Sequence, residues 1–317
     1  MTMSQTVPQP APCPAGIASS DALSARQTQV NQRLPALLPK EETPPARVHT
    51  AMRYALTAPG KRLRPVLLLS VAELFGGDRL RHAGEKGPVL DLACAVEMVH
   101  ACSLILDDLP MMDDAHLRRG RQTVHRAFGE DTAVLAAFGL LNRAYALVAE
   151  RGASLALGRY RGEDLIHHLS TAVGSDGLIG GQAHDLEARD QSLDLDRLEY
   201  IHSHKTGALF LCAAELGAMA ADARRRELSA ISRYAKNLGL AFQITDDLLD
   251  VEQASAVTGK DSGQDAGRPT FVTLLGRAGA RALAEELLDF AVASLAGLGR
   301  KADDLRALAR VVRTRRR

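Results

Sequence analysis

Residues Val89–Asp113 read VLDLACAVEMVHACSLILDDLPMMD. The first part is an apolar run of helical length, and two consecutive aspartates follow it with no basic side chain close by. Pro110 ends or kinks a helix, so Asp113 is expected on a distorted turn just beyond it. The stretch therefore predicts a long buried helix, Val89–Asp108, with carboxylates at its end.

A second acidic cluster, DDLLD, ends the helical run Leu238–Asp250. In a helix, residues three and four apart share a face, so one face of this run carries Gln243, Asp246, Asp247 and Asp250. Two carboxylates about 6 Å apart repel by about 3 kcal/mol at an effective dielectric near 20. A hard cation with oxygen ligands, such as Mg²⁺, would remove that repulsion and bridge to substrate phosphates. One cluster alone would also fit a solvated acidic helix end, but two such clusters favour a catalytic metal site.

The composition indicates a globular, helical chain. Of its 317 residues 46% are hydrophobic, only 4% are aromatic, and there is no Trp, which favours closely packed helices over sheets. The net charge of +1 argues against a general nucleic-acid binder. The basic end, Arg313–Arg317, is expected to be a frayed solvated tail, with contact to an anionic surface as the alternative.

Residues 1–20 are rich in Pro, Ala, Gln and Ser and lack the features of a signal peptide, so we expect a disordered tail before one domain over 21–317. No run of about 18 uninterrupted apolar residues suggests a membrane span. The cysteines have no metal-binding spacing and indicate buried free thiols in a reducing cytoplasm. They are Cys13, Cys94, Cys102 and Cys212.

Other long helices are expected over Glu130–Glu150, Leu195–Ala221 and Glu227–Asp250. The Gly-, Ser- and Asp-rich segment Ala254–Pro269 follows the second acidic cluster and is long enough to be a lid. No linker divides the chain. The sequence thus predicts a single all-α domain that places its two aspartate clusters on opposed helices.

Basic side chains accompany these clusters. Lys61 and Arg64 stand at the start of an apolar helical run, where a helix N-terminus already attracts anions, so they suit a diphosphate. His100 lies two helical turns before the first cluster on nearly the same face, although a lone histidine is as often structural. Arg118 and Arg119 follow that cluster closely; a solvated loop is their alternative interpretation.

Two further basic positions are candidates. The sequence Lys205-Thr206-Gly207 interrupts the helix expected over Leu195–Ala221, which suggests a kink at a functional point. Lys260 lies in the possible lid and would bring another cation over the site on closure.

Taken in order, these motifs resemble the trans-isoprenyl diphosphate synthase family, and most closely its bacterial geranylgeranyl diphosphate synthases. The resemblance rests on GKRLRP at 60–65, DDLPMMD at 107–113, RRG at 118–120, KTG at 205–207 and FQITDDLLD at 242–250. It covers nearly the whole chain beyond the first residues. It implies a helical bundle of the isoprenoid synthase type around a central cavity, and a homodimer.

The resemblance also implies a role for each matching residue. Mg²⁺ would be bound by Asp107, Asp113 and Asp246, supported by Asp108 and Asp250. The allylic diphosphate would be held by Arg118, Lys205 and Lys260. Isopentenyl diphosphate would be held by Lys61, Arg64, His100 and Arg119. The developing allylic cation would face Thr206 and Gln243. Arg268 departs from the family, which usually has Lys there; the positive charge is kept, but a guanidinium makes contacts of a different geometry from an ammonium.

The implied activity is condensation of isopentenyl diphosphate with dimethylallyl, geranyl or farnesyl diphosphate. Metal ions and fixed cations would stabilise the leaving diphosphate in an apolar, water-excluded tunnel. A helix rises about 5.4 Å per turn, close to one isoprene unit, so residues one turn before Asp107 set the tunnel floor. Cys102 and Ser103 are small, which predicts a twenty-carbon product with Phe138 or its neighbours closing the tunnel lower down; the alternative is that both are merely small packing residues. The resemblance implies that this product is all-E geranylgeranyl diphosphate.

Three other functions remain possible. Farnesyl diphosphate synthase is the nearest enzymatic alternative. A non-catalytic partner subunit of an isoprenyl synthase would use the same helices only to dimerise, but such subunits tend to lose an aspartate motif. A terpene cyclase has no use for the second diphosphate site that Lys61, Arg64 and His100 suggest. Supply of carotenoid precursors is an expectation from the family alone.

Overall fold

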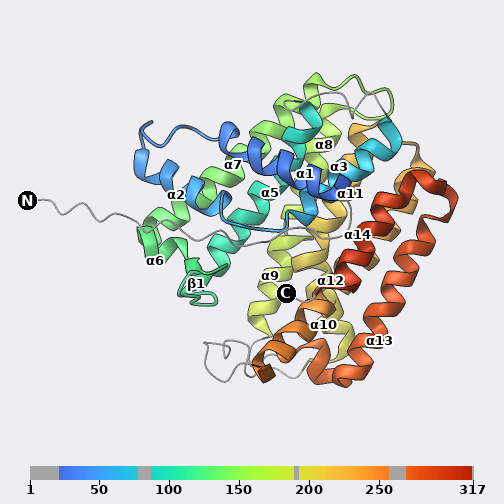
Figure 1. Cartoon of the computed structure of the whole chain (residues 1–317). Helices are drawn as coiled ribbons and strands as arrows, with labels where there is room; N and C mark the ends of the chain where they lie inside the picture. Colours follow the sequence, from blue (N-terminus) through green and yellow to red (C-terminus); the bar gives the residue numbers. More distant parts are fainter. Residues whose placement is uncertain (1–20, 78–86, 189–192, 257–268, 316–317) are drawn as a thin grey trace, which may run out of the picture.

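The structure, a computed structural model, describes residues 21–77, 87–188, 193–256 and 269–315. In these residues it is built almost entirely of helices (Figure 1). The one sheet among them is an antiparallel hairpin that pairs β1 (Leu117–Arg118) with β2 (Arg121–Gln122). The predicted all-α fold is therefore confirmed.

The centre of the fold is α5 (Pro88–Asp107), which ends within one residue of each predicted boundary. Proline occupies its first turn, and Asp108, two residues before Pro110, caps its end. The helix is apolar on every side and buried along most of its length because it is covered by other helices all round. It packs against α7 (Glu130–Ser154), α3 (Leu63–Gly76) and α11 (Ala208–Ala220).

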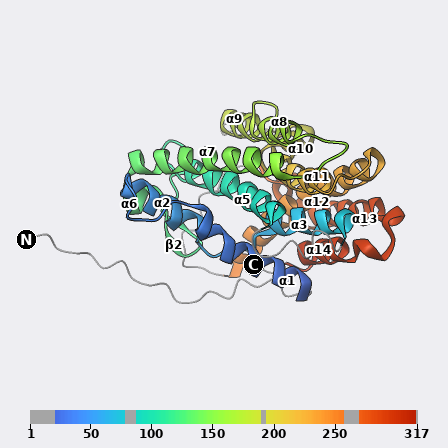
Figure 2. The same ribbon diagram turned by 90° about the horizontal axis from the view of Figure 1, so that it is seen from above.

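The remaining elements surround this centre. They are α1 (Asp21–Arg33), a 3₁₀ turn (Leu34–Leu37), α2 (Ala46–Leu56), α6 (Val124–Phe128), α8 (Gly162–Val173), α9 (Leu178–Glu187), α10 (Leu195–His202), a π-helix (Ser203–Gly207), α12 (Arg225–Ala256), α13 (Phe271–Ser294), a 3₁₀ segment (Ala296–Ala302) and α14 (Asp303–Arg313). Seen from above, α8 and α9 lie at one face and α1 and α14 at the opposite face, with α5, α3 and α11 between them (Figure 2).

The buried side chains form two clusters. The larger one surrounds α5 and joins α1, α2, α3, α7, α8, α11, α14 and parts of α12 and α13. The smaller one packs α10 against the later part of α12 and the first half of α13, around Ile244 and Phe271. Both are dominated by Leu and Ala, and the small alanines let the helices approach closely.

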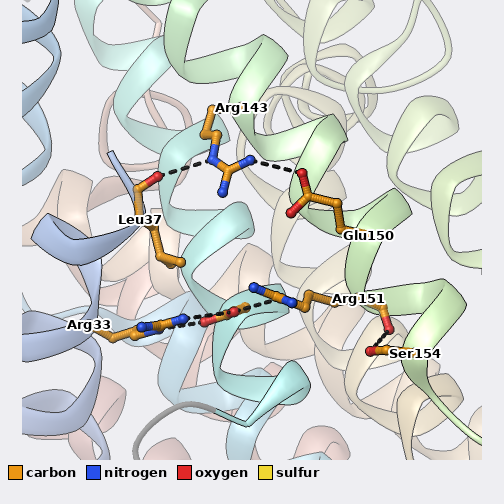
Figure 3. A network of polar contacts seen from close by, with 7 residues as sticks. Arg33, Leu37, Arg143, Glu150, Arg151 and Ser154 are labelled. Atoms are coloured by element: carbon orange, nitrogen blue, oxygen red, sulfur yellow. Dashed lines mark hydrogen bonds and ion pairs between the residues drawn. The ribbon is translucent and has the colours of Figure 1, made fainter. Parts of the chain in front are cut away.

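A buried carboxylate ties three helices of the larger cluster together. Asp91 on α5 is fully buried and accepts hydrogen bonds from Arg33 Nε of α1 and Arg151 Nε of α7, each at 2.7 Å. Close by, Arg143 links α7 to the 3₁₀ turn by donating to the carbonyl of Leu37 (Figure 3). Each charge is paired, as burial requires.

Two helices of the described residues, α5 and α7, are long and apolar enough to cross a membrane by length and composition alone. The apolar window of α5 is 78% buried inside the chain and that of α7 44%. A core helix passes the same test, and the burial of α5 fits that explanation.

Several predicted boundaries differ from the structure. Helix Leu195–Ala221 is divided by the π-helix, and the last long helix extends beyond Asp250 to Ala256. The first residues of the predicted lid, Ala254–Ala256, therefore belong to α12. Residues 257–268 lie outside the described part, as do residues 1–20. Cys94, Cys102 and Cys212 are buried free thiols, as predicted, whereas Cys13 is not described.

Candidate active site

The first aspartate cluster lies where α5 ends and the chain folds back on itself. The amide of Asp113 donates to the carbonyl of Asp107 at 2.9 Å, which returns the turn after Pro110 to the end of the helix. Asp108 is buried with 3% of its surface exposed. The distorted turn that Pro110 predicted is present, and it keeps the three carboxylates of the cluster near one another.

Burial and mutual repulsion affect Asp107. Burial raises the pKa of this carboxyl to about 6; Lys205 lowers the pKa, whereas Asp113 raises it. Lys205 therefore lies near enough to the first cluster to act on it electrostatically. The site therefore contains a carboxylate whose charge is costly without a cation.

Arg118 neutralises the neighbouring carboxylate. It lies on β1, and its Nε donates to Asp108 Oδ1 at 3.0 Å. The turn of the hairpin is formed by Arg119 (φ 54°) and Gly120 (φ 75°), both left-handed. This tight hairpin places Arg118 at the aspartates and Arg119 near His100 of α5.

The second cluster lies on α12, and its members have different surroundings. Asp247 accepts hydrogen bonds from Gln243 Nε2 at 3.0 Å and from the amide of Phe271 at 3.1 Å. Burial raises the pKa of Asp247 to about 6. These contacts fix the start of α13, so Asp247 has a structural role, whereas Asp246 and Asp250 remain the candidates for metal.

Asp246 is paired with a residue from the far end of the chain. Arg315 Nη1 lies 2.7 Å from Asp246 Oδ1, and its guanidinium stacks over the ring of Phe242, 4.5 Å from the centroid. Arg313 pairs with Glu285 of α13 at 2.7 Å. The prediction of a frayed, solvated basic tail is therefore wrong for Arg315, which is largely covered and paired with Asp246. Arg313 is exposed, as predicted, but it ends α14 in an ion pair and is not frayed.

The Lys-Thr-Gly segment lies in the π-helix between α10 and α11, which confirms that the α-helix is interrupted there. Thr206 Oγ1 donates to Gln243 Oε1 at 3.0 Å, so the two residues expected to face the allylic group lie together. Lys205 Nζ donates to Asp185 Oδ2 of α9 at 2.7 Å.

Asp185 is a site residue that the sequence analysis missed. Gly181 on the same helix allows the approach, since a Cβ there would lie 2.1 Å from the amide nitrogen of Lys205. The pair Gly180-Gly181 inside a helical run was the available signal of a close helix contact.

Four groups predicted to hold isopentenyl diphosphate form a crowded basic cluster. Arg64 lies over the ring of Phe210, 4.4 Å from the centroid, and its Nη1 is 3.5 Å from His100 Nε2. Burial lowers the pKa of Arg64 to about 10. Burial and the nearby arginines hold the pKa of His100 well below its usual value, so this imidazole is neutral near pH 7.

Lys61 and Arg119 complete the cluster. Burial, with repulsion from Arg315, lowers the pKa of Lys61 to about 8. Burial also lowers the pKa of Arg119. An open pocket of about 490 Å³ between α2, α5 and the hairpin adjoins His100 and Arg119. Positive groups that are held together and partly desolvated in this way favour binding of a multivalent anion.

The predicted chain-length residues differ in their placement. Cys102 is buried with 4% exposed, and burial raises the pKa of its thiol to about 12. Ser103 is half-buried and donates to the carbonyl of His100 at 2.9 Å. Phe138 is 61% exposed on the outside of α7. In the single chain it therefore does not close an internal tunnel, and that expectation is corrected, because α7 directs the ring away from α5.

The remaining predicted site residues have mixed outcomes. Lys260 and Arg268 lie outside the described residues. Among the described residues, no three His, Cys, Asp or Glu side chains meet closely enough to form a metal site on their own. The carboxylate oxygens of the two clusters nevertheless have the chemistry that Mg²⁺ prefers.

An all-α bundle with two acidic clusters, an interrupted Lys-Thr helix and a separate basic cluster is suited to substrates that carry diphosphate groups. Residues 45–293 match the polyprenyl synthetase family, and the chain belongs to this family.

Named relatives agree with this assignment. The chain is 43% identical to a geranylgeranyl diphosphate synthase of Pantoea ananas, over 81% of each chain. It is also 43% identical to a farnesyl diphosphate synthase of Geobacillus stearothermophilus, over 75% of this chain and 78% of that protein. The crystal structure of an FPP/GFPP synthase from Zymomonas mobilis is similar with a TM-score of 0.79 and 37% identity, covering 91% of this chain and 96% of that one. The chain is thus a trans-prenyltransferase.

Proposed function

We propose that this prenyltransferase condenses isopentenyl diphosphate with allylic diphosphates to give all-E geranylgeranyl diphosphate. The observation that carries the product length is the small size of Cys102 and Ser103, one turn before Asp107 on α5. The name of the Pantoea relative supports it. A farnesyl product is the second candidate, favoured by the names of the Geobacillus and Zymomonas relatives.

The basic cluster would hold isopentenyl diphosphate through Lys61, Arg64, His100 and Arg119. Its cations are already desolvated and close together, so a diphosphate would relieve their repulsion. His100, neutral when the site is empty, can still donate one ring hydrogen to a phosphate oxygen.

The allylic diphosphate would lie between the acidic clusters, where Lys205 and Arg118 meet it. In the structure Lys205 is paired with Asp185 and Arg118 with Asp108. These ion pairs would hold the two cations in place before the substrate binds. Thr206 and Gln243, joined at 3.0 Å, would present oxygen atoms to the developing positive charge of the allylic group. Lys260 of the undescribed segment is proposed to join them.

Mg²⁺ is the proposed cofactor, held by Asp107, Asp113 and Asp246 with Asp108 and Asp250 in support. When bound, it supplies charge neutralisation on the leaving diphosphate. The residues fit Mg²⁺ because their ligand atoms are carboxylate oxygens. In each cluster several carboxylates lie close enough to repel one another, and a bound cation would remove that repulsion. Arg118 and Arg315 partly neutralise these clusters in the structure.

Assembly and context form part of the proposal. A homodimer is supported by apolar side chains that α7 leaves exposed, Leu135 at 55% and Phe138 at 61%. A reducing cytoplasm is supported by the three buried free thiols. Supply of twenty-carbon precursors, for example for carotenoids, follows from the proposed product.

The test is incubation of the purified chain with Mg²⁺, isopentenyl diphosphate and each allylic starter in turn, followed by separation of the dephosphorylated products by length. A twenty-carbon product is expected, and chelation of the metal should abolish it. A fifteen-carbon product would instead establish the farnesyl alternative. Absence of any product with every starter would favour the non-catalytic partner subunit, and an Asp107→Asn variant provides the inactive control.

A further inference from the structure

Arg62 stands between Lys61 and Arg64, at the point where the chain enters α3. Its backbone is left-handed, with φ 51° and ψ 38°, which non-glycine residues rarely adopt. Such a conformation persists only where surrounding contacts hold it. Because the turn sets the directions of the residues on either side, whatever holds Arg62 also places Lys61 and Arg64.

The contacts of the Arg62 side chain reach three elements. Nη1 donates to Glu97 Oε1 of α5 at 2.6 Å, and Nε donates to Asn31 Oδ1 of α1 at 2.9 Å. Nη2 donates to the carbonyls of Leu56, the last residue of α2, at 3.0 Å and of Ala58 just beyond it at 2.6 Å. The planar guanidinium therefore fixes its position relative to all three helices at once.

Glu97 gives this arrangement its connection to the basic cluster. Its side chain and that of Arg62 are each 3% exposed, so the ion pair is fully desolvated. Glu97 lies three residues before His100 on the same face of α5. The Glu97 carboxylate also raises the pKa of both Arg64 and Arg119, which opposes the lowering of each pKa by burial.

We infer that Arg62 and Glu97 are positioning residues for the isopentenyl diphosphate site: their buried ion pair joins the turn that carries Lys61 and Arg64 to the helix that carries His100. Both side chains line the pocket beside His100, but each is only 3% exposed and is paired with the other, so their role is to place the binding groups. The pair keeps the cations in a binding arrangement before the diphosphate arrives, and the inference rests on the proposed assignment of that site.

A second buried pair serves as a matched control. Arg33 of α1 and Asp91 of α5 also join two helices at 2.7 Å, with Asp91 fully buried. They lie toward the other end of α5, away from the basic cluster. A purely stabilising role would make the two pairs equivalent, whereas a positioning role distinguishes them by their effect on ligand binding.

The experiment measures equilibrium binding of isopentenyl diphosphate alone, and of geranyl diphosphate with Mg²⁺, by calorimetry, together with thermal unfolding. Arg62→Lys keeps the charge but loses the fork of hydrogen bonds, so it should weaken isopentenyl diphosphate binding by about tenfold and geranyl diphosphate by less than about twofold. Asn31→Ala removes one contact and should weaken isopentenyl diphosphate by about threefold. Arg33→Lys should lower the unfolding temperature and leave both dissociation constants within about twofold.

Unchanged binding in folded Arg62→Lys overturns the inference, as does an equal loss in Arg33→Lys or an equal loss for both diphosphates. If Arg62→Lys does not fold, Asn31→Ala decides: selective weakening supports the inference, and unchanged binding overturns it. Product formation by the wild-type chain tests the proposed function separately.

Discussion

Lys61 shows how strongly single charges are perturbed in this site. It lies beside Arg315 in a partly buried position, and burial is the larger cause of its lowered pKa. A lysine that titrates near neutral pH loses its charge where an arginine keeps it. The pH dependence of substrate binding should therefore depend on this residue.

We expect the KM for isopentenyl diphosphate to rise with pH in the wild-type enzyme. Below the pKa of Lys61, about 8, the ammonium is present and binding is strongest; as pH rises through that value the charge is lost. Loss of one proton allows up to about a tenfold rise between pH 8 and 9. Steady-state kinetics from pH 7 to 9 would measure it. Lys61→Arg stays charged, so an identical rise in that variant would assign the effect to other groups.

Cys102 provides the residue-scale test of product length. We expect Cys102→Phe to move the main product from twenty to fifteen carbons, because the ring would fill the space one turn before Asp107. Overpacking of this buried position costs about 1–3 kcal/mol, so thermal unfolding must accompany the product assay. Cys102→Ser, of similar size, should keep the twenty-carbon product. A folded Phe variant with unchanged product would contradict the role of Cys102.

Residues near each other in sequence could be predicted, but their distant partners could not. Both acidic clusters, the turn after Pro110 and the Lys-Thr-Gly kink are local patterns of charge and helix breaking, and all are present. The pairing of Asp246 with Arg315 depends on how α14 returns to α12, which no local pattern encodes. The outward direction of Phe138 likewise depends on which face of α7 meets α5.

Among the elements, α9 and the π-helix lie in close contact beside the site. The backbone of Lys205 lies against Gly181, and the ion pair of Lys205 with Asp185 joins the same two elements. A π-helix has an irregular backbone that needs such support. The position of Lys205 over the first aspartate cluster is therefore set by a helix contact as well as by its side chain.

We expect Gly181→Ala to lower kcat/KM for the allylic substrate by about tenfold or more, because the added methyl would displace the backbone at Lys205 and misplace its ammonium. Steady-state kinetics at saturating isopentenyl diphosphate would measure it. Gly297→Ala is the matched control, since a Cβ there meets no atom within 4 Å. Equal kinetics of the two variants would show that the close contact does not set the site.

On the scale of the whole molecule, α7 exposes two neighbouring apolar side chains, Leu135 and Phe138. We expect Phe138→Asp to convert the proposed dimer to a single chain, because it places a charge among apolar contacts. Light scattering after gel filtration would measure the molar mass. Phe290→Asp changes a similarly exposed phenylalanine of α13, 54% exposed against 61% for Phe138, and should leave the dimer intact. A dimeric Phe138→Asp variant would place the interface elsewhere.

Because the core is divided into two clusters of unequal size, the smaller cluster should unfold before the larger one. The smaller cluster joins α10, the later part of α12 and the first half of α13, the region that carries the second aspartate cluster. It contains far fewer buried side chains than the cluster around α5. Amides of α13 near Phe271 should thus exchange with deuterated solvent sooner than those in the middle of α5, in a partial unfolding that leaves the larger cluster intact. Slow exchange throughout would indicate one cooperative unit.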